Sequence, residues 1–234
     1  AYLLRPAGRR AAAGRMRVIM TADGPIPVFI EPGRKWVFAS ALDWPGWARR
    51  GRTEDLAVQA LHEYLPRYAP IVARAGLAPV TGTLAVTERH PEPGVNADFG
   101  SLHEIAPSEC RTLPAEVGGR FAALLEAAWA AFDEVSGTAP DQLRKGPRGG
   151  GRDTGQIVAH VCAAETMYAR KMGLPRDKTS AGDPVVLLRA RIAAALCDPA
   201  TMAGPQNGWP PRYAARRIGW HVLDHLWEIE DKSE

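Results

Sequence analysis

The stretch RRIGWHVLDHLWEIED (residues 216–231) places two histidines one helical turn apart among apolar side chains. His221 and His225 are four residues apart, so on a helix they lie about 40° apart around the axis and both imidazoles can reach one ion. Histidine pairs at this spacing bind zinc in HExxH helices. The spacing therefore predicts a metal site. The alternative is that the pair belongs to a polar strip on an otherwise buried helix.

Three charged residues share the histidine face of this helix. Asp224 and Glu228 lie within one turn of the histidines, which is where a carboxylate can orient a ligand or act as a general base. Ordinary helix-surface charge is the alternative for each of them. Arg217 is placed to face an anionic substrate or cofactor, and the alternative is that Arg216 and Arg217 both point to solvent.

The second half of the chain has the apolar period of helices. From about Leu113 onward apolar residues recur every three to four positions, with turn residues between the periodic segments. No strand pattern separates these segments, so we predict an all-α four-helix bundle over residues 106–234. The expected helices are 115–137, 154–172, 184–196 and one from Pro211 to the chain end.

The first half has strand and turn patterns instead. The runs RVIMTA, IPVFIE and KWVFASAL within residues 17–42 predict a small antiparallel meander. Pro45 and Gly46 break the strand, so DWPGWARRG (residues 43–51) cannot continue it, and Thr53 caps a helix that runs to about Leu65. A second helix opens at Pro66 with a break near Pro70, and a strand at 80–89 precedes a loop. We therefore predict an α+β domain over 17–105, preceded by a flexible extension at 1–16.

The net charge of +3 is concentrated at one end of the 234-residue chain. Residues 1–17 contain five arginines and no acid, and the remainder has 24 basic and 26 acidic residues. Without a basic excess we expect no nucleic-acid partner. The sequence contains no run of about 18 apolar residues, so we predict no membrane span. Three widely spaced cysteines without a CxxC pair favour a reducing, cytoplasmic location.

The segment WVFASALDWPGWARRGRTEDLAVQALHEYL (residues 36–65) resembles the HicB-like antitoxin domain. That pattern is a strand, an acidic-x-Pro-Gly turn, Gly-x-Thr and a helix that begins with acidic residues. Asp43, Pro45, Gly46, Gly51 and Thr53 carry the match, which covers about 50 residues. The resemblance implies a HicB-like α+β fold, and no DNA-binding module accompanies it in the sequence.

The helical half resembles the DinB and YfiT superfamily, which includes thiol-dependent isomerases and transferases. Its pattern is a histidine on the second helix and HxxxH on a late helix, which together bind a divalent metal. IVAHVCAAE supplies His160, and WHVLDHLWE supplies His221 and His225. Only about 60 residues separate His160 from the pair, which is short for this family. The resemblance implies a three-histidine site for Zn, Ni or Fe.

Together these features predict a metal-dependent enzyme, and the DinB-like resemblance implies thiol transfer, isomerisation or hydrolysis of a small molecule. The alternative is a noncatalytic binding or interaction protein with a structural or vestigial metal site. Heavy use of Ala, Arg, Gly and Pro is typical of a GC-rich, actinobacterial genome. The DinB-like resemblance also implies a low-molecular-weight thiol such as mycothiol as a cosubstrate, and a homodimer is a further expectation.

Overall fold

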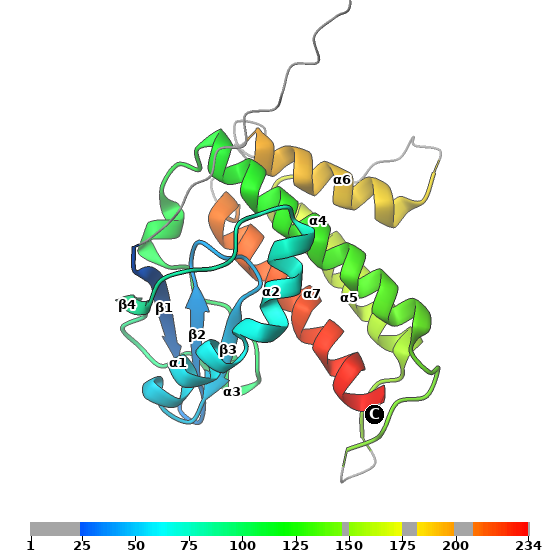
Figure 1. The fold of residues 1–234 in the computed structure, drawn as a ribbon, viewed down its shortest axis with the longest axis horizontal. Coiled ribbons are helices and arrows are strands. Elements are labelled where there is room, and N and C mark those ends of the chain that lie inside the picture. Colours follow the sequence, from blue (N-terminus) through cyan, green and yellow to red (C-terminus); the bar gives the residue numbers. More distant parts are fainter. Residues whose placement is uncertain (1–23, 147–149, 175–181, 199–207, 234) are drawn as a thin grey trace, which may run out of the picture.

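The computed structural model describes residues 24–146, 150–174, 182–198 and 208–233. The predicted extension at 1–16 and the predicted strand RVIMTA lie outside these residues. The described part is a mixed α and β structure, with one sheet in the first half and most of its helices in the second (Figure 1). Its elements are β1 (Ile26–Pro32), β2 (Val37–Ala41), β3 (Ala48–Gly51), α1 (Glu54–Glu63), α2 (Leu65–Arg74), β4 (Leu84–Arg89), α3 (Val95–Asp98), the short 3-10 helix η1 (Pro107–Cys110), α4 (Ala115–Thr138), α5 (Thr154–Lys171), α6 (Pro184–Cys197) and α7 (Pro211–Ser233).

The four described strands form one sheet in the order β3-β2-β1-β4. The first three pair antiparallel, and Val28 of β1 lies opposite Ala41 of β2. β4 joins the far edge of β1 in parallel, with Ile26 opposite Leu84. β4 thus adds one strand to the predicted meander. The helices α1 and α2 precede it in the chain, because a parallel pair needs a long crossover connection.

The prediction that Pro45 and Gly46 break the strand is confirmed, since β2 ends at Ala41, but the prediction missed the strand that follows the turn. Gly46 has φ +97, a conformation that glycine adopts without strain, and it reverses the chain between β2 and β3. The Trp47 amide donates to the Trp44 carbonyl at 3.0 Å across this turn. Ala48–Gly51 then pairs with β2 as an additional strand.

The helix predictions in the second half are confirmed, with ends within one or two residues of those expected. Local capping explains several of the boundaries. Thr53 Oγ1 accepts from the Leu56 amide at 3.3 Å at the start of α1, and Asp183 accepts from the Val185 amide at 2.8 Å at the start of α6. The predicted break at Pro70 is wrong, since α2 continues through this exposed residue. Buried side chains on both sides of Pro70 hold α2 against the core.

The helix α7 lies between the two halves of the molecule. In Figure 1 it runs from orange to red, with the sheet on one side and α4 and α5 on the other. Fifteen of its 23 residues are buried, so its polar side chains are enclosed as well as its apolar ones. A single cluster of buried apolar residues extends from Ile26 in β1 to Ile229 in α7. The core is therefore continuous across the predicted boundary at residues 105 and 106.

Backbone contacts bring α7 close to the turn between β2 and β3. A Cβ atom on Gly219 would lie 2.9 Å from the Gly46 amide nitrogen and 3.0 Å from the Pro45 carbonyl carbon. Two glycines therefore permit the turn to pack directly on the helix backbone. This contact fixes α7 relative to the sheet, two residues before His221.

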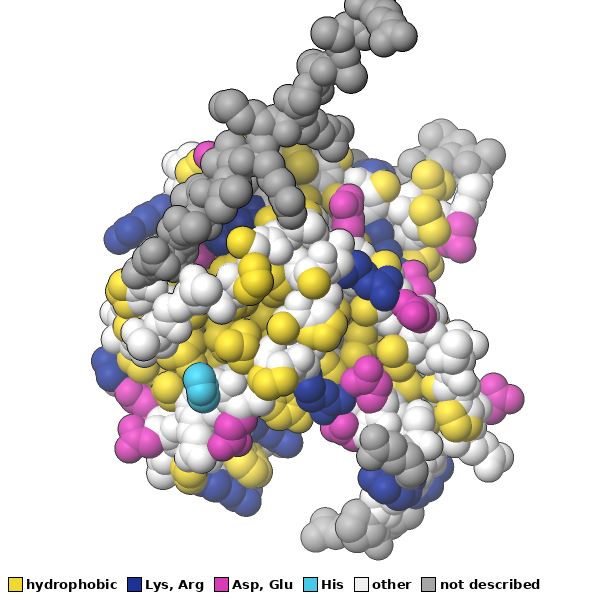
Figure 2. Space-filling view, in the orientation of Figure 1, with side chains coloured by type: hydrophobic (Ala, Val, Ile, Leu, Met, Phe, Trp, Pro, Cys, Tyr) yellow, Lys and Arg dark blue, Asp and Glu magenta, His cyan; other side chains and the backbone are white. Residues whose placement is uncertain are grey.

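The face that Figure 2 shows has no large patch of one charge. Basic and acidic side chains alternate around the rim of that face, and hydrophobic side chains fill its centre. Within the described ranges, no helix has both the length and the apolar character that crossing a membrane requires.

Candidate metal centre

The three predicted histidine ligands lie together between α5 and α7. One nitrogen from each of His160, His221 and His225 lies within 4.8 Å of one from each of the others. The Nε2 atoms of His160 and His221 are 3.2 Å apart, although the residues are 61 positions apart in sequence. The fold thus brings the mid-chain histidine to the pair on α7.

The spacing of the nitrogen atoms fits a shared cation. Two imidazole nitrogens that bind one tetrahedral zinc at about 2.0–2.1 Å lie about 3.3 Å apart. The 3.2 Å separation of His160 and His221 agrees with this value. The same distance also fits a hydrogen bond between the two rings, so the distance alone supports both arrangements.

His225 has a carboxylate that orients its ring. Its Nδ1 lies 2.7 Å from Glu228 Oε2, and Lys232 contacts the other oxygen of the same carboxylate. The hydrogen bond from His225 and then the charge of Lys232 lower the pKa of Glu228 to about 2. A carboxylate that accepts from Nδ1–H leaves the Nε2 lone pair free to bind a cation, as is usual for histidine ligands.

Burial keeps the other two imidazoles neutral. Burial, together with the nearby charges of His225 and Arg217, lowers the pKa of His221 to about 2. Burial also lowers the pKa of His160, which is less enclosed, and Arg152 adds to the effect. Metal binding requires the neutral ring, so this environment holds both residues in the form that binds a cation. The buried Nδ1 of His221 has no hydrogen-bond partner in the described structure.

Asp224 is paired with an arginine of β3. Its carboxylate accepts from Arg49 Nη1 at 2.9 Å. The Arg49 guanidinium lies 3.7 Å from the Tyr64 ring centroid and 4.2 Å from that of Trp227. The two carboxylates that the sequence singles out therefore have different surroundings, because Glu228 supports a histidine and Asp224 joins α7 to β3.

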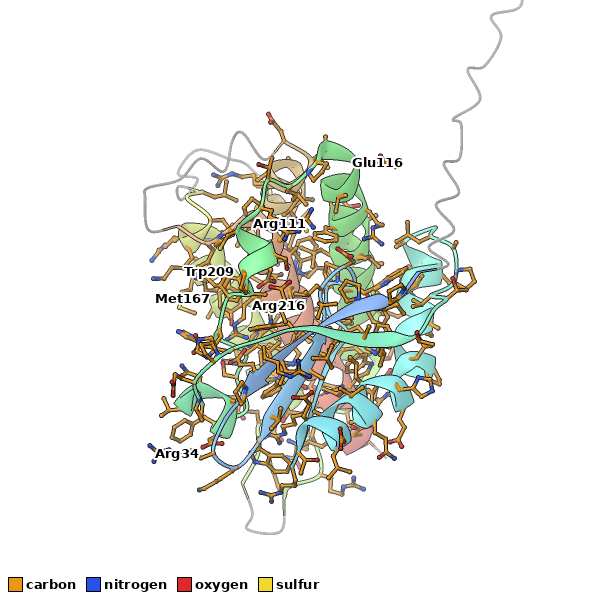
Figure 3. The ribbon with its side chains drawn as sticks, turned by 90° about the vertical axis from the view of Figure 1, so that its left-hand side faces the viewer. Arg34, Arg111, Glu116, Met167, Trp209 and Arg216 are labelled. Atoms are coloured by element: carbon orange, nitrogen blue, oxygen red, sulfur yellow. The ribbon has the colours of Figure 1, made fainter. Side chains whose placement is uncertain are left out.

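Arg216 and Arg217 are both buried, so the alternative that they point to solvent is wrong. Arg216 makes a two-point ion pair with Glu109, through Nε at 2.6 Å and Nη2 at 2.9 Å. Figure 3 shows Arg216 inside the molecule beside the sheet, whereas Arg34 extends outward. Arg217 donates from Nη2 to Ser101 Oγ at 2.9 Å and lies on the side of α7 that carries His221.

Two neighbours of this site carry no recognisable signal in the sequence. Tyr168 of α5 is buried, and its ring centroid is 5.5 Å from that of His221 and 5.1 Å from the Arg217 guanidinium carbon. The sequence predicts only that Tyr168 faces the core. Ser101 lies in the segment between α3 and η1, more than a hundred residues before its partner Arg217.

Other polar groups near the helices have structural partners. Glu165, which the sequence does not assign, is fully buried and accepts from Arg189 Nε at 3.0 Å. The Cys162 thiol has a raised pKa because of burial and the charge of Glu165, which disfavours a nucleophilic thiolate. A surface hollow of about 280 Å³ lies beside the histidine site, with Glu228, Asp224, Arg49 and Lys232 among its lining residues.

Comparisons of the chain with models of known protein families, with curated proteins and with solved structures found no match. The resemblances to HicB-like and DinB-like proteins therefore depend on the sequence patterns alone. The arrangement of the site is independent of those resemblances, since it follows from where the side chains lie.

Proposed function

We infer that the protein is a metal-dependent enzyme that acts on a small molecule at His160, His221 and His225. The observation that carries this proposal is the convergence of three histidine nitrogens within 4.8 Å of one another. Three imidazoles without a fourth protein ligand in the described cluster leave positions free for water or substrate, which is the form of a catalytic site. When bound, a divalent cation such as Zn, Ni or Fe lowers the pKa of a water or thiol that reaches it and so supplies a nucleophile near neutral pH.

The residues of the chain have distinct roles in this proposal. His160, His221 and His225 hold the cation, and Glu228 fixes the tautomer of His225. Glu228 is also the carboxylate nearest to the ligands, so it is the candidate general base. Asp224 acts through Arg49 to position α7 and takes no part in the chemistry.

Thiol transfer, isomerisation and hydrolysis are the reaction types that the DinB-like pattern implies, with a low-molecular-weight thiol such as mycothiol as cosubstrate. The HicB-like half supports the site from the other side of α7. Its segment after α3 contributes Ser101, which contacts Arg217 next to the histidines. We propose that this half completes the pocket rather than binding DNA.

Elemental analysis of protein purified without a histidine tag tests the metal centre. We expect about one divalent metal ion per chain, and at least a tenfold loss of bound metal in His160→Ala, because two ligands bind much more weakly than three. The matched control is His62→Ala, which removes an exposed histidine of α1 and should retain the metal. A wild-type protein that takes up neither Zn, Ni nor Fe after metal-free preparation contradicts the proposal.

Reaction with a thiol separates the enzyme from the noncatalytic alternative. The metal-loaded protein is mixed with a low-molecular-weight thiol and an electrophilic probe, and consumption of the thiol is followed. Faster consumption with the wild type than with His160→Ala supports thiol transfer. Metal binding without any acceleration rejects the transferase reaction and favours hydrolysis or a structural metal site.

A further inference from the structure

Arg217 is a buried cation that has no carboxylate partner among the residues that the structure describes. Its exposed fraction is 8%, and its Nε and Nη1 atoms are buried without any hydrogen-bond partner. Its one described hydrogen bond is from Nη2 to the neutral Ser101 hydroxyl. Arginine stays protonated even when buried, so the charge persists. An uncompensated buried charge is strongly destabilising, and such a feature calls for an acceptor that is absent from the chain itself.

The other two buried arginines of the described structure do have counter-charges. Arg216 pairs with Glu109, and Arg189 pairs with Glu165 and Asp133. Both of these arginines join elements of the fold. The fold thus supplies carboxylates where an arginine is structural, and among the described residues it supplies none to Arg217.

Further unmatched donors lie next to Arg217. The Nε1 atom of Trp220 and the Nδ1 atom of His221 are also buried without partners. The Arg217 guanidinium carbon lies 4.7 Å from the Trp220 ring centroid. The Tyr168 ring borders both Arg217 and His221, at 5.1 Å and 5.5 Å. Arg217 and His221 are therefore neighbours that share the Tyr168 ring.

We propose that Arg217 binds the carboxylate of a short ligand whose other end reaches the three-histidine cluster. A carboxylate carries the missing counter-charge and only accepts hydrogen bonds, so it can accept from Nε or from Nη1, the two donors of Arg217 that have no described partner. Arg217 and His221 are four residues apart, about one helical turn of 5.4 Å. That spacing fits a small carboxylic acid with a thiol, hydroxyl or carbonyl group a few bonds away. The second half of this inference rests on the proposed metal-dependent function.

Calorimetric titration with two matched probes tests the inference. The probes are 3-mercaptopropionate and its uncharged analogue 3-mercaptopropanamide, which differ only in the carboxylate. With zinc-loaded wild type we expect the carboxylate probe to bind at least tenfold more tightly than the amide. This preference should disappear in Arg217→Met and remain in part in Arg217→Lys, which keeps a positive charge but has fewer hydrogen-bond donors. Equal binding of both probes to zinc-loaded wild type overturns the inference and leaves the metal proposal intact.

Titration of the metal-free protein with propionate and propanamide separates the two proposals. If the chain binds no zinc but still prefers propionate through Arg217, the carboxylate site holds and the proposed function fails. The unfolding midpoint in urea without ligand supplies a second measurement. We expect Arg217→Met to raise it, because an unpaired buried charge is removed, whereas a clear decrease assigns Arg217 a structural role and overturns the inference.

Discussion

Two adjacent arginines of α7 have opposite electrostatic surroundings. Arg216 belongs to a carboxylate-rich cluster with Glu109 and Glu31, in which acidic groups outnumber the one cation. Arg217 belongs to a histidine-side cluster with His160, His221 and His225, which has no carboxylate beside its arginine. The first cluster is close to complete within the chain and holds α7 to η1 and the sheet. In the second cluster, the three histidines could bind a cation and Arg217 could bind an anionic ligand.

The difference separates a cluster that joins elements of the fold from a cluster that is suited to binding a ligand. Buried charges with full sets of partners join elements of a fold, whereas buried polar atoms without partners concentrate where a ligand supplies them. Along α7 the change from one kind to the other occurs between consecutive residues. Exposure alone does not reveal it, because both arginines are buried.

The largest effect should come from breaking the complete cluster. Arg216→Met leaves Glu109 and Glu31 buried without their cation, and we expect a loss of about 3–5 kcal/mol in the free energy of unfolding. Urea unfolding followed by circular dichroism measures it. The double variant Arg216→Met/Glu109→Leu should recover much of the loss, because both ends of the pair become apolar. A loss below about 1 kcal/mol in the single variant would contradict the assigned role of Arg216.

The next effect sharpens the contrast between the two carboxylates on the histidine face. Glu228→Gln removes the charge that orients His225, and we expect a 10–100-fold weaker affinity for zinc, which is typical of outer partners of a metal ligand. Competition with a chromogenic chelator measures it. Asp224→Asn is the matched control and should keep the wild-type affinity, since Asp224 pairs with Arg49. A larger loss in Asp224→Asn than in Glu228→Gln would reverse these roles.

The smallest effect is the dependence of the free energy of unfolding on the protonation of Glu31, the second carboxylate of the cluster. Burial raises the pKa of Glu31 from 4.5 to about 6 against the opposing charge of Arg216. Between these values the folded state holds a proton that the unfolded state has released. The free energy of unfolding should therefore fall by about 2 kcal/mol as the pH rises through that window. In Glu31→Gln this part of the pH dependence should be absent, and an unchanged profile would show that Glu31 does not cause it.

Local signals in the sequence predicted most elements of the fold. Thr53 and Asp183 act as helix caps through their own side chains, so the starts of α1 and α6 are encoded locally. The strand β3 escaped prediction because Pro45 and Gly46 form a turn, and the turn becomes recognisable only when β2 lies beside the returning chain. The parallel pairing of β4 with β1 likewise depends on a crossover that no local pattern specifies.

Less of the candidate site than of the fold could be predicted from local sequence patterns. The four-residue spacing of His221 and His225 fixes their common face, and the histidine of α5 could be added only through a family resemblance. The buried state of Arg216 depends on Glu109, which is 107 residues away, and no short pattern reports such a contact. Ser101 and Tyr168 were missed for the same reason, since each gains its role from a neighbour distant in sequence.

The enclosure of α7 affects how any mutational survey of this protein should be interpreted. Substitutions along this helix will disturb packing against the sheet, against α4 or against α5 at most positions, so intolerance there is expected whatever the protein does. Loss of function in a screen therefore does not distinguish a ligand-binding residue from a packing residue in α7. Paired variants of adjacent residues, assayed for occupancy and for folding separately, make that distinction.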